Sequence, residues 1–180
     1  MTKLVNFSRV FPAYHPKNGQ STHFVEAILK QLNIDYTSND YFIWLCENNK
    51  NISELFLDKF HQSLSENIYP KSHTIRSHTR PVNVGDYINP TCWAGSPYKK
   101  TVEGFWKIKF APDIEVKKVW DIQINHALSW FETIIDNKQF DDWSSLGKND
   151  GLKNEDFIDW FKKDNIITGR IICWNQNINY

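Results

Sequence analysis

The sequence predicts an α+β fold: a small, mostly antiparallel, barrel-like β-sheet with flanking helices, in one domain spanning residues 1–180. Two observations predict it. Between residues 23 and 65, apolar side chains recur at the spacing of amphipathic helices. From Lys71 onward, short alternating segments are separated by Gly, Pro, Asn and Asp, which is typical of several strands joined by tight turns.

The first part of the chain is expected to hold one strand and three helices. Pro12, Pro16 and Asn18-Gly19 break the alternation of the first strand and predict a loop before the first helix. Pro70 ends the helical block. We interpret residues 33–70 as a helical insertion. The expected strand covers 3–10, and the expected helices cover 23–32, 41–47 and 53–65.

The second part is expected to be mainly β. Pro90 implies an edge strand or a bulge, and Ile122 and Ile124 are expected to share one face. Asp136-Asn137 predicts a hairpin turn. Expected strands cover 72–77, 86–93, 102–110, 114–119, 121–124, 131–135, 138–140 and 169–174, and expected helices cover 142–147 and 154–163.

The charge composition is balanced, with 21 Lys and Arg residues against 21 Asp and Glu residues. A protein that coats duplex phosphates usually has a basic surplus, so this balance argues against broad, non-specific nucleic-acid binding. No apolar stretch reaches the length of about 20 residues needed to span a bilayer. Three widely separated cysteines indicate a reducing cytoplasm, and we expect no metal site and no cofactor.

One segment concentrates hydrogen-bond donors in this neutral chain. It reads Lys-Ser-His-Thr-Ile-Arg-Ser-His-Thr-Arg over residues 71–80, and Val-Gly-Asp-Tyr-Ile follows at 84–88. Two arginines, a lysine, two histidines and several hydroxyls suit an anionic or hydrogen-bond-rich ligand.

The pattern Lys-x-x-Thr-Ile-Arg followed by Val-Gly-Asp-x-Ile resembles the signature of ASCH domains, which belong to the PUA-like superfamily of small β-barrels. Residues 149–161 resemble a later acidic segment of that family, and Cys92–Tyr98 is similar to a segment of small ASCH-like proteins of bacteriophages and their hosts. The resemblance implies a PUA-like barrel with a pocket. It covers about residues 71–174, whereas 33–70 has no counterpart in it.

Some small ASCH proteins are amidohydrolases acting on N4-acylated cytidine, with a Lys, a Thr and a Glu as proposed machinery. The resemblance places these roles on Lys71, Thr74 and Asp150. Asp150 is one methylene shorter than Glu, so its carboxylate is expected to fall about 1 Å short, enough to slow a reaction substantially. Asp150 is equally interpreted as a turn residue, and Glu155 and Asp156 are alternative acids or partners of a helix dipole.

The candidate ligand-binding residues are basic and aromatic. Arg76 is a candidate for anion binding or an exposed ion pair, and Arg80 for phosphate contact or a solvated loop. Trp93 and Tyr98 are candidates for base stacking or for packing. The remaining candidate, His15, lies in a loop. His73 falls between Lys71 and Thr74, so alternation is expected to point it away from both.

Three functions follow from these residues. The first is binding of a nucleotide, a nucleobase or a short single-stranded RNA or DNA in an ASCH-type pocket. The second is hydrolysis of an amide on a modified nucleobase. The third is binding of a protein partner through the helices of residues 33–70. No membrane partner is expected, and the expected location is the cytoplasm, which is the host cytoplasm if the protein is phage-encoded.

Overall fold

The computed structural model describes residues 1–180 except 66–68, 79–80, 103 and 127–130. It has the mixed α and β character that the sequence predicts. The strands are β1 (Thr2–Phe7), β2 (His73–Arg76), β3 (Tyr87–Trp93), β4 (Lys107–Lys109), β5 (Ile114–Glu115), β6 (Lys118–Asn125), β7 (Glu132–Ile135), β8 (Lys138–Gln139) and β9 (Ile166–Cys173); the helices are α1 (Phe24–Gln31), α2 (Asn39–Asn48), α3 (Glu54–Gln62), α4 (Trp143–Asn149) and α5 (Asn154–Phe161).

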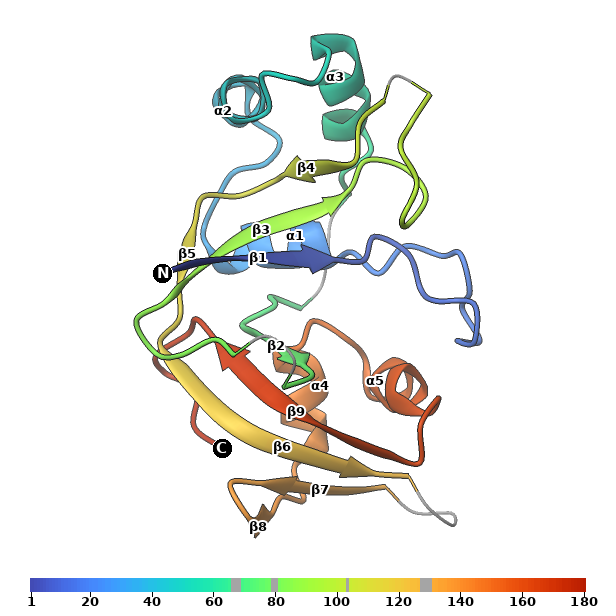
Figure 1. The fold of residues 1–180 in the computed structure, drawn as a ribbon, viewed down its shortest axis with the longest axis vertical. Helices are drawn as coiled ribbons and strands as arrows, with labels where there is room; N and C mark the ends of the chain where they lie inside the picture. The colour runs from blue at the N-terminus through green and yellow to red at the C-terminus, as the bar shows by residue number, and fades with distance from the viewer. Residues whose placement is uncertain (66–68, 79–80, 103, 127–130) are drawn as a thin grey trace.

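The strands form two hydrogen-bonded sheets (Figure 1). The first sheet has the order β1-β3-β4, with β5 also paired to β3, and β1 and β3 run parallel. The second sheet is antiparallel, with the order β2-β9-β6-β7-β8. Within the described residues neither sheet closes on itself, so the expected single barrel is replaced by two open sheets. The large aromatic Phe7 of β1 bridges them, since its ring meets those of Phe110 and Trp174 edge-on at centroid distances of 5.9 and 6.3 Å.

The helices expected at 41–47 and 53–65 are confirmed as α2 and α3, which lie beyond β4 at one end of the molecule (Figure 1). They bury Tyr41, Leu45, Leu57 and Phe60, and they expose Ile43 and Leu55. Their role as an insertion and as a partner surface stays a prediction.

Two local predictions in the second sheet are confirmed. Ile122 and Ile124 of β6 are both buried, as alternation requires. Asp136 and Asn137 connect β7 to β8 with φ angles of 47° and 64°, the left-handed values that a two-residue hairpin turn needs.

The prediction of a strand over 102–110 is largely wrong, because only Lys107–Lys109 forms a strand, β4. Gly104, with φ of 90°, closes a turn by donating its N–H to the carbonyl of Thr101 at 2.9 Å. The alternation of apolar residues therefore continues into a hairpin turn, where Val102 is fully exposed. Ile108 and Phe110, the last two of the predicted face, are buried.

The expectation of an edge strand at Pro90 is also wrong, because β3 lies between β1 on one side and β4 and β5 on the other. Pro90 accepts from the N–H of Phe110 at 3.3 Å but has no N–H to return. The hydroxyl of Tyr41 donates to the Phe110 carbonyl at 2.8 Å instead. A side chain of α2 thus replaces the hydrogen bond that a proline removes from the sheet.

Candidate functional site

Lys71 is held between α1 and the residue that follows β9. Its N–H donates to the carbonyl of Ala27 at 3.0 Å, and its own carbonyl accepts from the indole N–H of Trp174 at 3.0 Å. These two bonds fix the backbone on either side, so the side chain enters the interior with an exposed fraction of 1%. Its ammonium nitrogen lies 4.1 Å from the centroid of the Phe24 ring, a cation–π contact.

Asp150 is the partner of Lys71. The Lys71 Nζ atom donates to the Asp150 Oδ1 atom at 2.5 Å and to its main-chain carbonyl at 2.6 Å. The carboxylate therefore reaches the lysine, in contrast to the shortfall expected for an aspartate in place of a glutamate. Asp150 ends α4, and Gly151 follows with φ of 79°, so the turn interpretation and the pairing with Lys71 hold together.

Gly151 brings this turn against the lysine. A Cβ atom at this position would lie 3.1 Å from the Cβ atom of Lys71, and the positive φ is itself unfavourable for other residues. The Asn-Asp-Gly sequence thus supplies both the acid and the clearance that the lysine stem needs.

Burial disfavours the charged form of both partners and therefore shifts their pKa values in opposite directions. It lowers the pKa of Lys71 to about 8, although the charge of Asp150 opposes the shift. It raises the pKa of Asp150 above its ordinary value, against the effect of Lys71. Both shifts bring the neutral amine and the neutral acid closer in free energy to the ion pair.

His73 extends the pair into a buried network. Its Nε2 atom lies 3.7 Å from Asp150 Oδ1, and its Nδ1 atom lies 2.8 Å from the hydroxyl of Tyr180, which also accepts from the Asn149 amide at 3.0 Å. The prediction that His73 points away from Lys71 is wrong, because residues two apart share a face of an extended chain. Burial, and secondarily the charge of Lys71, lowers the pKa of His73 well below its usual value.

Thr74 and Arg76 alternate with His73 along β2 and so occupy its other face. Arg76 donates to the carbonyl of Asn6 at 2.8 Å, and its guanidinium lies 5.2 Å from the centroid of the Phe7 ring. Thr74 is buried, and its hydroxyl makes no hydrogen bond with any described residue. Of the predicted Lys–Thr–acid set, Lys71 and Asp150 are therefore in contact. Thr74 lies on the opposite face of β2 from His73.

Two pockets open on the described surface near this network, and Lys71, Thr74 and Asp150 line neither of them. The smaller, of about 290 Å³, lies over Gly151 and between the loop of residues 11–23 and α5. The larger, of about 400 Å³, lies beside Arg9, and we call it the Arg9 pocket. Its lining residues are Ser8, Arg9, Val10, Gly19, Ser21, His23, Ser63, Ser65, Trp93, Ala94, Gly95 and Pro97.

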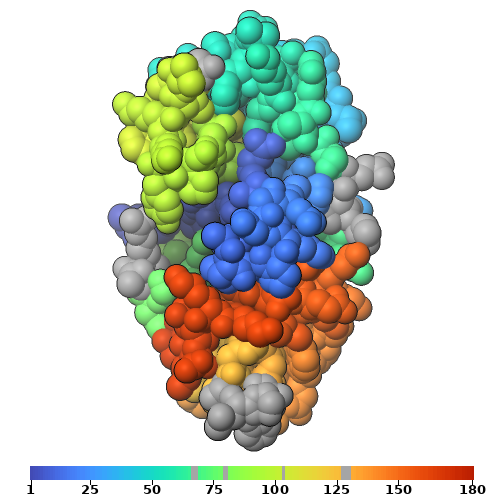
Figure 2. Space-filling view, turned by 90° about the vertical axis from the view of Figure 1, so that its right-hand side faces the viewer, coloured from blue at the N-terminus to red at the C-terminus, as the bar shows by residue number. Residues whose placement is uncertain are grey.

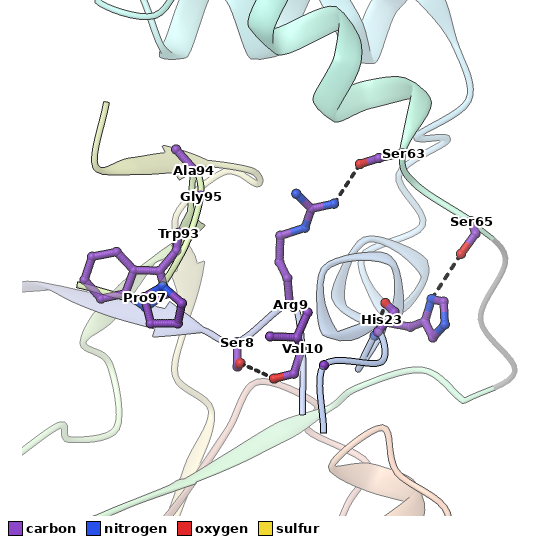
Figure 3. A pocket seen from close by; sticks show the side chains of 12 residues that line it. Ser8, Arg9, Val10, His23, Ser63, Ser65, Trp93, Ala94, Gly95 and Pro97 are labelled. Carbon is purple, nitrogen blue, oxygen red and sulfur yellow. Dashed lines mark hydrogen bonds between the residues drawn. The ribbon is translucent and has the colours of Figure 1, made fainter. Parts of the chain in front are cut away.

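Three segments distant in sequence form the Arg9 pocket. In Figure 2 the segment around residue 100 and the region of α3 stand on either side of the N-terminal segment. Arg9 extends between them and donates to the Ser63 hydroxyl at 2.7 Å (Figure 3). Its guanidinium also lies 4.8 Å from the centroid of the Phe60 ring, so the cation is oriented by packing while one side of it faces the cavity.

His23 stands at the wall shared by the two pockets. Its Nδ1 atom lies 3.1 Å from the Ser65 hydroxyl (Figure 3) and also 3.5 Å from the Oε1 atom of Glu26, which lies outside the pocket lining. A serine nucleophile activated by a histidine needs the serine and the acid on different ring nitrogens. Since both contacts fall on Nδ1, this trio is suited to hydrogen bonding with a ligand rather than to nucleophilic catalysis.

Of the predicted ligand-binding residues, Trp93 lines the Arg9 pocket, and Tyr98 packs on Trp93 with centroids 5.0 Å apart. His15 is buried: its Nε2 atom lies 3.2 Å from the Asp156 carbonyl and its ring stacks on Phe11 at 4.2 Å. Arg80 lies outside the described residues. Arg9 was missed because a lone arginine after a strand carries no sequence signal of a pocket, which depends on segments about 50 and 85 residues away.

No group of three or more His, Cys, Asp and Glu side chains placed to hold a metal ion occurs in the part of the chain that the structure describes. Within the same residues, no helix is long and apolar enough to cross a bilayer. A comparison of the chain with protein-family models, with curated proteins and with solved structures found no match.

Proposed function

We propose that this protein binds a nucleotide, a nucleobase or a short single-stranded nucleic acid in the Arg9 pocket. The observation that carries the proposal is the combination of one oriented guanidinium, four serine hydroxyls and an indole around one cavity. Arginine binds phosphate through its planar array of donors, hydroxyls bind sugars and base edges, and indoles stack on bases. A volume of about 400 Å³ lies in the range of small-ligand sites.

The electrostatics of the pocket favour an anionic group. Arg9 is hydrogen-bonded to a neutral serine, and no described carboxylate pairs with it, so its charge is available to a phosphate. A ligand phosphate at Arg9 leaves the sugar and base to extend toward Trp93 or toward His23 and Ser65 (Figure 3).

Calorimetric titration with UMP, CMP, AMP and GMP tests this function. Arg9→Gln is expected to weaken nucleotide binding at least tenfold, because a hydrogen bond to a charged group contributes about 1.5–3 kcal/mol. The matched control is Arg170→Gln, since Arg170 pairs with Asp121 on the second sheet and lines neither pocket. Binding weaker than millimolar for all four nucleotides, or equal losses in both variants, would remove the proposal.

The chain is further proposed to be an ASCH-type member of the PUA-like superfamily, located in the cytoplasm. Support comes from the signature residues themselves. Lys71 meets Asp150, and Gly85 has the positive φ of 83° that a Gly-Asp turn before β3 calls for. An experimental structure in which β2, β9 and β6 do not superpose on the strands of ASCH domains would contradict this relationship.

A second candidate function is hydrolysis of an N4-acylated cytidine or a related base, and the contact between Lys71 and Asp150 favours it. A lysine whose pKa is about 8 is partly neutral near pH 8 and can accept a proton. Because Thr74 faces the other side of β2 from His73, the attacking oxygen in this proposal is that of a water molecule, and Lys71 takes its proton as the oxygen adds to the acyl carbon. The C–N bond then breaks, the leaving nitrogen takes a proton from Asp150, and the carboxylic acid is released.

Release of cytidine from N4-acetylcytidine separates this candidate from binding alone. Activity that disappears in folded Lys71→Met but persists in Arg170→Gln would support hydrolysis. Since Lys71 is 1% exposed, substrate entry also requires the packing around Gly151 to open. Equal activity in the wild type and in folded Lys71→Met would dismiss Lys71 as the base.

A further inference from the structure

The connection between β3 and β4 carries an unusual set of exposed side chains. Over residues 99–109 the sequence contains four lysines and one glutamate, in a chain whose total charge is zero. In the same hairpin Tyr98 is 82% exposed and Trp106 is 49% exposed. Solvent-facing aromatic rings beside lysines are the pattern of surfaces that bind single-stranded nucleic acids.

The rings and the cations of this hairpin are arranged in pairs. Lys107 Nζ lies 4.7 Å from the centroid of the Trp93 ring, and Lys100 Nζ lies 5.7 Å from that of Trp106. Tyr98 packs on Trp93 at 5.0 Å with a tilt of 52°. We call the six residues Trp93, Tyr98, Lys99, Lys100, Trp106 and Lys107 the lysine–aromatic hairpin.

The hairpin is built as a firm platform. The N–H of Ala94 donates to the Trp106 carbonyl at 3.1 Å, and that of Thr101 donates to the Phe105 carbonyl at 2.8 Å, which closes the loop at two levels. Phe105 turns inward and packs on Phe56 of α3 at 5.4 Å. The contact of Phe105 with Phe56 shows that packing partners are within reach of this hairpin. Tyr98 and Trp106 nevertheless face solvent.

Tyr98 shows a further sign of a special role. Its φ is 61°, in the left-handed region that non-glycine residues rarely adopt. Strain of this kind tends to persist at binding sites, where the surrounding structure maintains it. Here the strained backbone presents a large ring to solvent next to the pocket wall formed by Trp93, Gly95 and Pro97.

From this arrangement we infer that the ligand of the Arg9 pocket is part of a single-stranded nucleic acid, whose next nucleotides run over the lysine–aromatic hairpin. This inference rests on the proposed function and specifies its ligand as a polymer. Trp93 belongs both to the pocket and to the hairpin, so the two surfaces are continuous. Tyr98 and Trp106 supply stacking surfaces, and Lys99 and Lys100 supply charge for the phosphates.

Lys99 and Lys100 present their charges to solvent, with no ion pair to a carboxylate among the residues that the structure describes. By contrast, Lys109 at the end of β4 pairs with Asp113 at 2.8 Å. The unpaired lysines thus lie at the outer end of the hairpin, and the neutralised one lies near the body of the sheet.

The test compares UMP with uridine and deoxythymidine oligonucleotides of two, four and eight residues, using calorimetry and fluorescence anisotropy. The octamer is expected to bind at least tenfold more tightly than UMP. Tyr98→Ala is expected to weaken octamer binding about five- to tenfold through loss of one stacked base, while UMP binding stays within twofold. The RNA and DNA series decide which polymer is preferred.

The double variant Lys99→Ala/Lys100→Ala tests the phosphate contacts through the salt dependence of octamer binding. It is expected to reduce the slope of log affinity against log salt by about 1.4, since each phosphate contact of a single strand contributes about 0.7. The matched control is Lys162→Ala/Lys163→Ala, another adjacent exposed pair, which lies beyond α5. The control is expected to leave the slope unchanged.

The outcomes separate this inference from the proposed function. Octamer binding no tighter than UMP binding, or octamer binding unaffected by the hairpin variants, overturns the inference and leaves the nucleotide pocket standing. Hairpin-dependent octamer binding without measurable UMP binding supports the inference and overturns the pocket as a nucleotide site. Absence of binding by any probe overturns both.

Discussion

The Lys71–Asp150 network and the Arg9 pocket both place a cation beside aromatic rings, but they differ in their access to water. Lys71 is 1% exposed, pairs with Asp150, which His73 also approaches, and contacts the Phe24 ring in the interior. Arg9 is half-buried, bonded to an exposed serine and in contact with a cavity. Charge in the interior changes pKa values and stability, whereas charge at the surface remains available to a ligand.

The largest expected effect comes from breaking the interior pair. Lys71→Met leaves the Asp150 carboxylate buried without its partner, which typically costs about 3–5 kcal/mol. Urea unfolding measures the loss. The double variant Lys71→Met/Asp150→Asn is expected to recover at least about 1 kcal/mol of it, because it removes the unpaired charge. Equal stabilities of the two variants would show that packing, and not charge, controls the site.

A second effect concerns pH. The pKa of Lys71 is about 8 in the folded protein and about 10.4 in a solvated chain, so between these values the unfolded state binds more protons. Stability contributed by this group therefore rises with pH across that window, by at most about 1.4 kcal/mol per pH unit. The raised pKa of Asp150 acts in the opposite direction, so its contribution falls as pH rises above about 3.9.

An NMR titration of the Lys71 side chain checks this directly, with an expected midpoint near pH 8. The difference in unfolding free energy between wild type and Lys71→Met should increase from pH 8 to 10, and the comparison isolates this lysine from groups that the two proteins share. A midpoint at the ordinary lysine value would place the amine in contact with water and would contradict the closed site.

A smaller effect is expected at Tyr180. Tyr180→Phe removes the hydroxyl that contacts His73 Nδ1 at 2.8 Å and accepts from Asn149 at 3.0 Å. Leaving these buried groups without their partner is expected to cost about 1–3 kcal/mol. The ring packing on Trp120 and Phe140 is retained, so thermal unfolding reports the polar contacts. Tyr14→Phe, which loses an exposed hydrogen bond to the Trp160 carbonyl, is the control and should cost less.

The smallest effect on stability is expected at the open site. Arg9→Gln loses a hydrogen bond to an exposed serine and a contact with Phe60, and should cost less than about 1 kcal/mol. The same variant is expected to produce the large loss of nucleotide binding. A stability loss equal to that of Lys71→Met would erase the distinction between the interior charge and the surface charge.

Sequence reasoning worked best where the signal was local. The shared face of Ile122 and Ile124, the Asp136-Asn137 turn and the helices near 41–47 and 53–65 depend on neighbours within a few residues. It failed for the edge strand predicted at Pro90 and for the strand predicted over 102–110. There the outcome depended on the Tyr41 hydroxyl from α2 and on a turn at Gly104, which alternation alone does not reveal.

The candidate sites divide in the same way. The signature residues from Lys71 to Arg76 and the Asn-Asp-Gly turn could be singled out in the sequence, because each is a compact run of polar residues. The residues that these side chains contact could not be singled out from the sequence. His73 joins Asp150 and Tyr180 across separations of 77 and 107 residues, and the Arg9 pocket needs segments from three parts of the chain.

By itself the sequence determined the α+β composition, the positions of most helices and strands, and the polar segment beginning at Lys71, since periodicity and turn chemistry act over short distances. Only the tertiary structure decided that the strands form two sheets, that Lys71 is sealed against Asp150, and that Arg9 faces a cavity. These features arise from contacts between residues far apart in the chain, and burial, which sets the pKa of Lys71, exists only once those contacts form.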